Sequence, residues 1–129
     1  MKKITFLVAL ALLLSLSTLA ACGGGGSTPA SGSTTVTMGG TSFDQTSVTI
    51  TKGSTITFTN DQGSPTHNLV NGTNGKASPE AGAADFGGGQ LVSGSGKSWT
   101  SPPWNTAGTF HVTCTFHPNT MTMTVTVTG

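Results

Sequence analysis

Alternation of threonine with apolar residues is the feature that most constrains how this chain can fold. Residues 121–128 alternate Met or Val with Thr through eight positions, and residues 47–51, 55–59 and 109–114 alternate in the same way. Successive side chains of a strand point to opposite faces, so a period of two rich in β-branched residues is typical of half-buried strands. No segment from residue 34 onward has a helical period. The sequence therefore predicts an all-β domain.

The connections between these segments favour a sandwich or a barrel, because several short strands are separated by Gly, Asn and Pro. Residues 71–96 are rich in glycine and are predicted to form one long loop, of the kind that is functional or mobile. Within it, we expect Glu80 and Asp85 to be solvated loop charges. Trp99 and Trp104 are predicted to pack in the core or at its edge.

The start of the chain is typical of a secretory signal peptide. Lys2 and Lys3 precede an apolar run over residues 6–14, which is shorter than the roughly 20 residues that span a bilayer. The Leu-Ala-Ala-Cys sequence at residues 19–22 resembles the lipobox of bacterial lipoproteins. We therefore expect residues 1–21 to be a signal peptide. A short N-terminal membrane anchor or an ordinary cleavage site are the alternatives.

The lipobox resemblance implies that Cys22 carries lipid and begins the mature protein. Residues 22–33 contain little besides Gly, Ser, Thr, Pro and Ala, so they are predicted to be a flexible linker that forms no core. Residues 34–129 then form the folded domain. We expect this domain to lie outside the cytoplasm, tethered to the membrane through the lipid on Cys22.

Charge excludes one class of partner. From residue 34 onward the chain carries three lysines, no arginine and four acidic residues. Nucleic-acid binding needs a basic patch, and none can form from so few cations. We expect no nucleic-acid partner.

A short motif near the C-terminus carries the strongest chemical signal. Cys114, His117 and Met121 lie within eight residues, and a second histidine, His67, lies upstream. One Cys, two His and one Met are the ligands of a blue copper centre, with a trigonal His₂Cys plane and a weak axial thioether. Cys114 is in phase with apolar residues of an alternating strand and so points inward. This donor set predicts a mononuclear copper site.

The same residues resemble the cupredoxins, the small blue copper proteins that include plastocyanin, amicyanin and auracyanin. The resemblance covers about residues 34–129 and is strongest at His67-Asn68 and at Cys114-x-x-His117-Pro118 followed by Met121. It implies a Greek-key β-sandwich of about eight strands with its copper site at one end. His67, Cys114 and His117 would be the equatorial ligands and Met121 the axial one.

The resemblance also implies roles around the metal. Asn68 would hydrogen bond across to the Cys114 loop and hold it in place. Electrons would leave through a partly exposed His117, beside an apolar docking patch formed by Pro118 and the loop around His67. The implied function is that of a monomeric one-electron carrier, cycling between Cu(I) and Cu(II) and exchanging electrons with redox protein partners.

Two details of the ligand set stay open. Three residues separate His117 from Met121, a spacing between those of amicyanin-like and plastocyanin-like loops, so Met123 is a fallback axial ligand. His111 alternates out of phase with Cys114, so we expect it to be a surface histidine that faces away from the site.

Other functions fit the residues less well. A copper oxidase would need His-x-His pairs, a thiol–disulfide enzyme would need Cys-x-x-Cys, and a Cys–His nucleophile would need an orienting third group. We therefore predict that the protein is not an enzyme. A copper-delivery protein on the same fold is the main alternative, and a sandwich without a metal is a third. With Cys22 lipidated and Cys114 bound to metal, we expect no disulfide.

Overall fold

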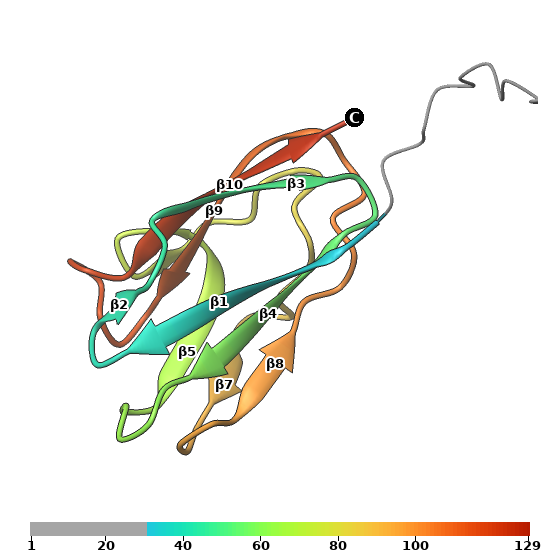
Figure 1. Cartoon of the computed structure of the whole chain (residues 1–129). Coiled ribbons are helices and arrows are strands. Elements are labelled where there is room, and N and C mark those ends of the chain that lie inside the picture. Colours follow the sequence, from blue (N-terminus) through green and yellow to red (C-terminus); the bar gives the residue numbers. More distant parts are fainter. Residues whose placement is uncertain (1–30) are drawn as a thin grey trace, which may run out of the picture.

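A computed structural model describes residues 31–129 and shows a β-sandwich (Figure 1). The described part of the chain contains ten strands and no helix. In chain order they are β1 (Ser33–Gly39), β2 (Ser42–Phe43), β3 (Ser47–Thr51), β4 (Thr55–Asn60), β5 (His67–Thr73), β6 (Lys76–Ala77), β7 (Gln90–Val92), β8 (Ser98–Thr100), β9 (Gly108–Cys114) and β10 (Thr122–Thr128).

The strands form two mixed sheets. One has the order β2-β1-β4-β8, and the other has the order β3-β10-β9-β5-β6 with β7 paired to β5. β1 runs parallel to β4 and β3 runs parallel to β10, whereas the other pairs are antiparallel. The predicted all-β sandwich is confirmed. Two of its ten strands, β2 and β6, are only two residues long.

The four predicted alternating segments are all strands, with small shifts at their ends. β3 matches residues 47–51, while β4 extends the prediction by one residue to Asn60 and β9 begins one residue early at Gly108. The last strand begins at Thr122, so Met121 lies just before it rather than within it. The reason is that the Met121 N–H donates to the His117 carbonyl, which closes a loop.

The prediction of one long loop over residues 71–96 was wrong. β5 continues to Thr73, and both β6 and β7 lie inside the predicted loop. β5 pairs with β9 on one side and with β6 and β7 on the other, and its side chains are buried without a regular alternation. Leu69 and Val70 are adjacent, so they point to opposite faces, and both are buried. A strand with buried side chains on both faces carries no period of two, so its pattern does not reveal it.

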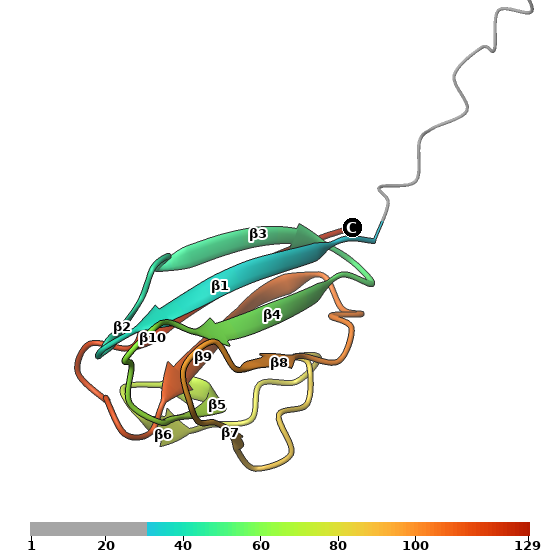
Figure 2. The ribbon, with the colours of Figure 1, turned by 60° about the horizontal axis from the view of Figure 1, so that its bottom comes forward.

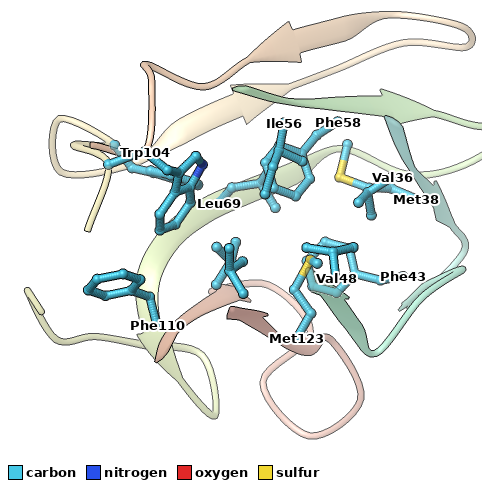
Figure 3. Packing of buried hydrophobic residues seen from close by; sticks show 14 of the residues in the cluster. Val36, Met38, Phe43, Val48, Ile56, Phe58, Leu69, Trp104, Phe110 and Met123 are labelled. Atoms are coloured by element: carbon cyan, nitrogen blue, oxygen red, sulfur yellow. The ribbon is translucent and has the colours of Figure 1, made fainter. Parts of the chain in front are cut away.

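The core fills the space between the sheets (Figure 3). Phe58 of β4 lies at its centre, with ring centroids about 6 Å from those of Phe43, Phe86 and Trp99. Trp104 is fully buried, and its Nε1–H donates to Ser101 Oγ at 3.1 Å. Trp104 is thus a core residue and Trp99 a half-buried one, as the sequence predicted.

The two ends of the sandwich differ. The first described residues and the C-terminus lie at one end, and the loop between β9 and β10 lies at the other (Figures 1 and 2). Hydrogen bonds fix both ends: Gly32 N–H donates to Ser54 Oγ at one, and Thr120 Oγ1 donates to the Thr41 carbonyl at the other. The seven residues of β1 separate these ends by about 20 Å.

Glu80 is not a solvated charge as expected. Its Oε2 accepts the His111 backbone N–H at 2.6 Å, and its Oε1 lies 2.7 Å from His111 Nδ1. This pair attaches the segment after β6 to β9, and both side chains are only partly exposed. Asp85 is exposed, as predicted, and accepts the Gly87 N–H through Oδ1.

The predictions for the signal peptide, for Cys22 and for most of the linker fall on residues 1–30, outside the described residues. No membrane-spanning helix is found among residues 31–129.

Candidate metal centre

Cys114 is the last residue of β9 and lies on the core side of the site. It follows Phe110 and Val112 on the core side of the strand and is 0% exposed. The chain then turns, with the His117 N–H donating to the Cys114 carbonyl at 3.3 Å. This turn returns His117 toward the strand end, so that its Nδ1 lies 3.5 Å from Cys114 Sγ.

His67 reaches the same point from a different part of the fold. It is the first residue of β5, pairs with Val92 of β7 and is 0% exposed. The next strand over is β9, where Cys114 pairs with Leu69. This register brings His67 Nδ1 to 3.8 Å from Cys114 Sγ, across 47 residues of sequence.

The three donors have the geometry of a metal site. The ligand atoms of His67, Cys114 and His117 all lie within 4.8 Å of one another, and the two imidazole centroids are 5.1 Å apart. A trigonal metal with bonds of about 2.3 Å to sulfur and about 2.0 Å to nitrogen would hold S and N about 3.7 Å apart. The observed S···N distances of 3.5 and 3.8 Å bracket this value. The residues therefore fit a bound metal.

Two methionines lie near the end of β9, in different settings. Met121 is fully buried and is the last residue of the loop that follows Cys114 and carries His117. Its carbonyl accepts the Cys114 N–H at 2.9 Å. Met123 lies two positions further, inside β10 opposite Val112, and belongs to the hydrophobic core. The loop position favours Met121 as the axial donor.

Asn68 connects the two parts of the site. Its Nδ2 donates to Thr115 Oγ1 at 3.0 Å, and its backbone carbonyl accepts the Thr115 N–H at 2.9 Å. Gly89 lies against the amide of Asn68, since a Cβ atom at Gly89 would be 2.7 Å from Asn68 Oδ1. Sequence reasoning proposed a bond from Asn68 to the Cys114 loop, but it identified neither Thr115 nor Gly89. The run of three glycines at residues 87–89 was the sequence signal for a close approach of the backbone to another residue.

The surroundings of His67 favour a neutral imidazole at that position. Burial, and secondarily the neighbouring His117, lowers the pKa of His67 below its ordinary value of 6.5. A neutral ring keeps a lone pair on one of its two nitrogens, and this is the form that binds a metal. His67 Nε2 is buried and has no hydrogen-bond partner among the described residues.

The site is closed on the protein side and apolar at its surface. His117 is only half-buried, unlike His67 and Cys114. The two large apolar side chains that are exposed in the described part of the chain both lie next to site residues. Phe116, 53% exposed, precedes His117, and Leu91, 66% exposed, pairs with Asn68.

The third histidine is not part of this centre. His111 interacts with Glu80, and the metal-binding group found within residues 31–129 contains only His67, Cys114 and His117. Cys114 forms no disulfide. The predicted position of His111 away from the site is thus confirmed, although the residue is half-buried against Glu80 rather than free at the surface.

Comparison with known proteins agrees with this geometry. Residues 30–128 match the family model described as copper binding proteins of the plastocyanin/azurin family. No curated protein sequence matches the chain.

Solved cupredoxin structures share the fold. Amicyanin from Paracoccus versutus is 22% identical with a TM-score of 0.55, covering 74% of this chain and 81% of that one. A purple cupredoxin from Nitrosopumilus maritimus is 21% identical with a TM-score of 0.57, covering 74% of this chain and 99% of that one. His67, Cys114, His117 and Met121 form a site consistent with one copper ion. Because the family model matches residues 30–128, the chain belongs to the plastocyanin/azurin family of copper-binding proteins.

Proposed function

We propose that this protein is a one-electron carrier with a single blue copper site. The observation that carries the proposal is the convergence of His67 Nδ1, Cys114 Sγ and His117 Nδ1 at one buried end of the sandwich. Thiolate and imidazole suit both Cu(I) and Cu(II), and a weak thioether adjusts the potential between them. Bound copper would supply the one-electron couple.

The chain's own contribution is rigidity. Cys114 ends a strand that is paired on both sides, and His67 begins a strand that is paired on both sides. Asn68 and Thr115 connect the two ligand-bearing segments by two hydrogen bonds. Donors held in this way move little when the charge of the site changes, which keeps the reorganisation small. The proposal assigns no enzymatic activity to the chain.

Electron exchange would take place at the apolar end of the molecule. His117 is the most exposed of the three donors, and Phe116 lies beside it with half of its surface in water. An exposed aromatic next to an otherwise closed site suits brief contact with another protein. We expect redox proteins to dock here as donor and acceptor, and the carrier to act as a monomer.

A membrane tether is compatible with this arrangement. Residue 31, where the described chain begins, lies at the end opposite the loop that carries His117 (Figure 2). A lipid on Cys22 would therefore hold the domain outside the cytoplasmic membrane while leaving the docking end free. Labelling of growing cells with a radioactive fatty acid tests this part. Label on the wild type that Cys22→Ala lacks supports the tether, and an unlabelled wild type contradicts it.

Copper delivery is the second candidate, and burial argues against it. Cys114 and His67 are both 0% exposed, so a partner has no direct route to either donor. Proteins that hand over copper need ligands that a recipient can reach.

The visible absorption spectrum after addition of one equivalent of Cu(II) tests the electron-carrier function. We expect an intense blue thiolate-to-copper band that mild reductant bleaches and that Cys114→Ala lacks. His111→Ala is the matched control, because this histidine is outside the site and should leave the band in place. A colourless complex would overturn the electron-carrier proposal and favour delivery.

A further inference from the structure

A hydrogen-bond network through two threonine hydroxyls connects the copper loop, residues 115–121 between β9 and β10, to the turn between β5 and β6. Thr113 is next to Cys114 on β9, on the opposite face of the sheet, and is 0% exposed. A buried hydroxyl must find partners for its hydrogen and its lone pairs, since an unpaired one costs about 1–3 kcal/mol. The Thr113 hydroxyl has a partner for its hydrogen and for both of its lone pairs.

The donors and acceptors can be assigned completely. Thr113 Oγ1 donates to the Met121 carbonyl at 2.9 Å and accepts the Gly75 N–H at 2.9 Å. With its hydrogen used, it must be the acceptor in its 2.8 Å contact with Thr122 Oγ1. Thr122 Oγ1 in turn accepts the Asn74 N–H at 3.1 Å. The network therefore runs in one direction, from the turn to Met121.

The network ends on the backbone of the axial donor. The Met121 carbonyl accepts two hydrogen bonds, from Thr113 Oγ1 and from the Cys114 N–H. The Met121 N–H donates to the His117 carbonyl. Both peptide groups that flank the Met121 side chain are therefore attached to the segment that carries the thiolate and the second imidazole.

The turn that begins the network also touches the copper loop directly. Asn74 and Gly75 have φ values of 53° and 71°, in the left-handed region, which directs their N–H groups toward Thr122 and Thr113. A Cβ atom at Gly75 would overlap Pro118, so the turn lies closely against the loop. The β5–β6 turn thus braces the loop at Pro118 and, through the threonines, at Met121.

We propose that Thr113 is a positioning residue that fixes the distance of Met121 from the copper ion, with Thr122 and the Asn74-Gly75 turn as its support. This inference rests on the copper site proposed above. Thr113 touches neither the metal nor its donor atoms, and it acts through the Met121 carbonyl. Because the axial thioether donates electron density that favours Cu(II), a Met121 that drifts away raises the reduction potential.

The test is Thr113→Val, which keeps the shape of the side chain and removes the hydroxyl. We expect the copper-loaded variant to stay blue with a reduction potential above that of the wild type. Thr113→Ser, which restores the hydroxyl, should return the potential toward the wild-type value. In the copper-free protein, the Gly75 amide hydrogen should exchange about tenfold faster in Thr113→Val, because its acceptor is gone.

Thr109→Val is the matched control. Thr109 lies on the same face of the same strand, away from the copper loop, and its hydroxyl makes no hydrogen bond within residues 31–129. If Thr113→Val and Thr109→Val both keep the wild-type potential, the inference is wrong while the copper site stands. If the wild type itself gives no blue band, both proposals fall together.

Thr122→Val keeps the inference testable if Thr113→Val does not fold. Thr122 is half-buried, and its loss leaves the Thr113 bond to Met121 in place. We expect faster exchange of the Asn74 amide and a smaller rise in potential. Unchanged exchange and an unchanged potential would contradict the proposed support.

Discussion

Asn68 and Thr115 are joined by two hydrogen bonds of opposite direction. The Thr115 N–H donates to the Asn68 carbonyl at 2.9 Å, and Asn68 Nδ2 donates to Thr115 Oγ1 at 3.0 Å. Asn68 follows His67, and Thr115 follows Cys114. The pair therefore fixes the position of one imidazole donor relative to the thiolate donor, across a separation of 47 residues.

Removal of the Asn68 side chain should loosen this connection. We expect Asn68→Ala to lower the free energy of unfolding of the copper-free domain by about 1 kcal/mol, because one neutral hydrogen bond is lost. The blue band of the copper-loaded protein should weaken or shift as His67 and Cys114 lose their fixed separation. Urea denaturation and absorption spectra measure the two effects. Thr66→Val, which removes a hydroxyl pair with exposed Ser93, should leave the band unchanged.

Gly89 and Gly88 offer a test of close packing against Asn68. Both have positive φ, 137° and 82°, so alanine strains the backbone at either position. A Cβ atom at Gly89 would meet the Asn68 amide at 2.7 Å, whereas one at Gly88 meets nothing within 4 Å. We expect both variants to be less stable in urea, but only Gly89→Ala to alter the blue band. Equal spectral changes in both would refute a specific contact with Asn68.

The Glu80–His111 pair should stabilise the fold without affecting the metal. Glu80→Ala removes two hydrogen bonds to a carboxylate, one of them from a backbone N–H. Bonds to charged groups contribute about 1.5–3 kcal/mol when buried, and this pair is partly exposed, so we expect a loss of about 1–2 kcal/mol in unfolding free energy. Asp85→Ala is the control with an exposed carboxylate and should cost less. The reduction potential should be the same in both.

The identity of the axial donor is tested by two leucine variants. Both Met121 and Met123 are buried, and leucine fills a similar volume, so each change should cost less than about 1.5 kcal/mol of stability. We expect Met121→Leu to raise the reduction potential, because the thioether is lost, and Met123→Leu to leave it near the wild-type value. Voltammetry of the two variants decides the assignment. A shift in Met123→Leu alone would make Met123 the axial donor.

Local patterns account for what could be predicted of the fold. Alternation in residues 47–51, 55–59 and 109–114 needs only neighbouring residues to be visible, and all three segments are strands. β5 escaped prediction because the adjacent residues Leu69 and Val70, on opposite faces, are both buried, so the strand lacks a period of two. Glu80 was misassigned because its partner, His111, is 31 residues away and no local signal links them.

The sequence by itself determined the chemistry of the centre. Cys114, His117 and Met121 lie within eight residues, so any tight turn keeps them near one another, and their donor types select copper. Only the tertiary structure decided how this loop is held. The β5–β9 pairing brings His67 to 3.8 Å from Cys114, and the threonine network attaches Met121 to the Asn74-Gly75 turn. The contacts that His67, Asn74 and Gly75 make with Cys114, Thr122 and Thr113 join residues 38 to 48 positions apart. Strand register and long-range hydrogen bonding set them, and a local pattern does not encode either.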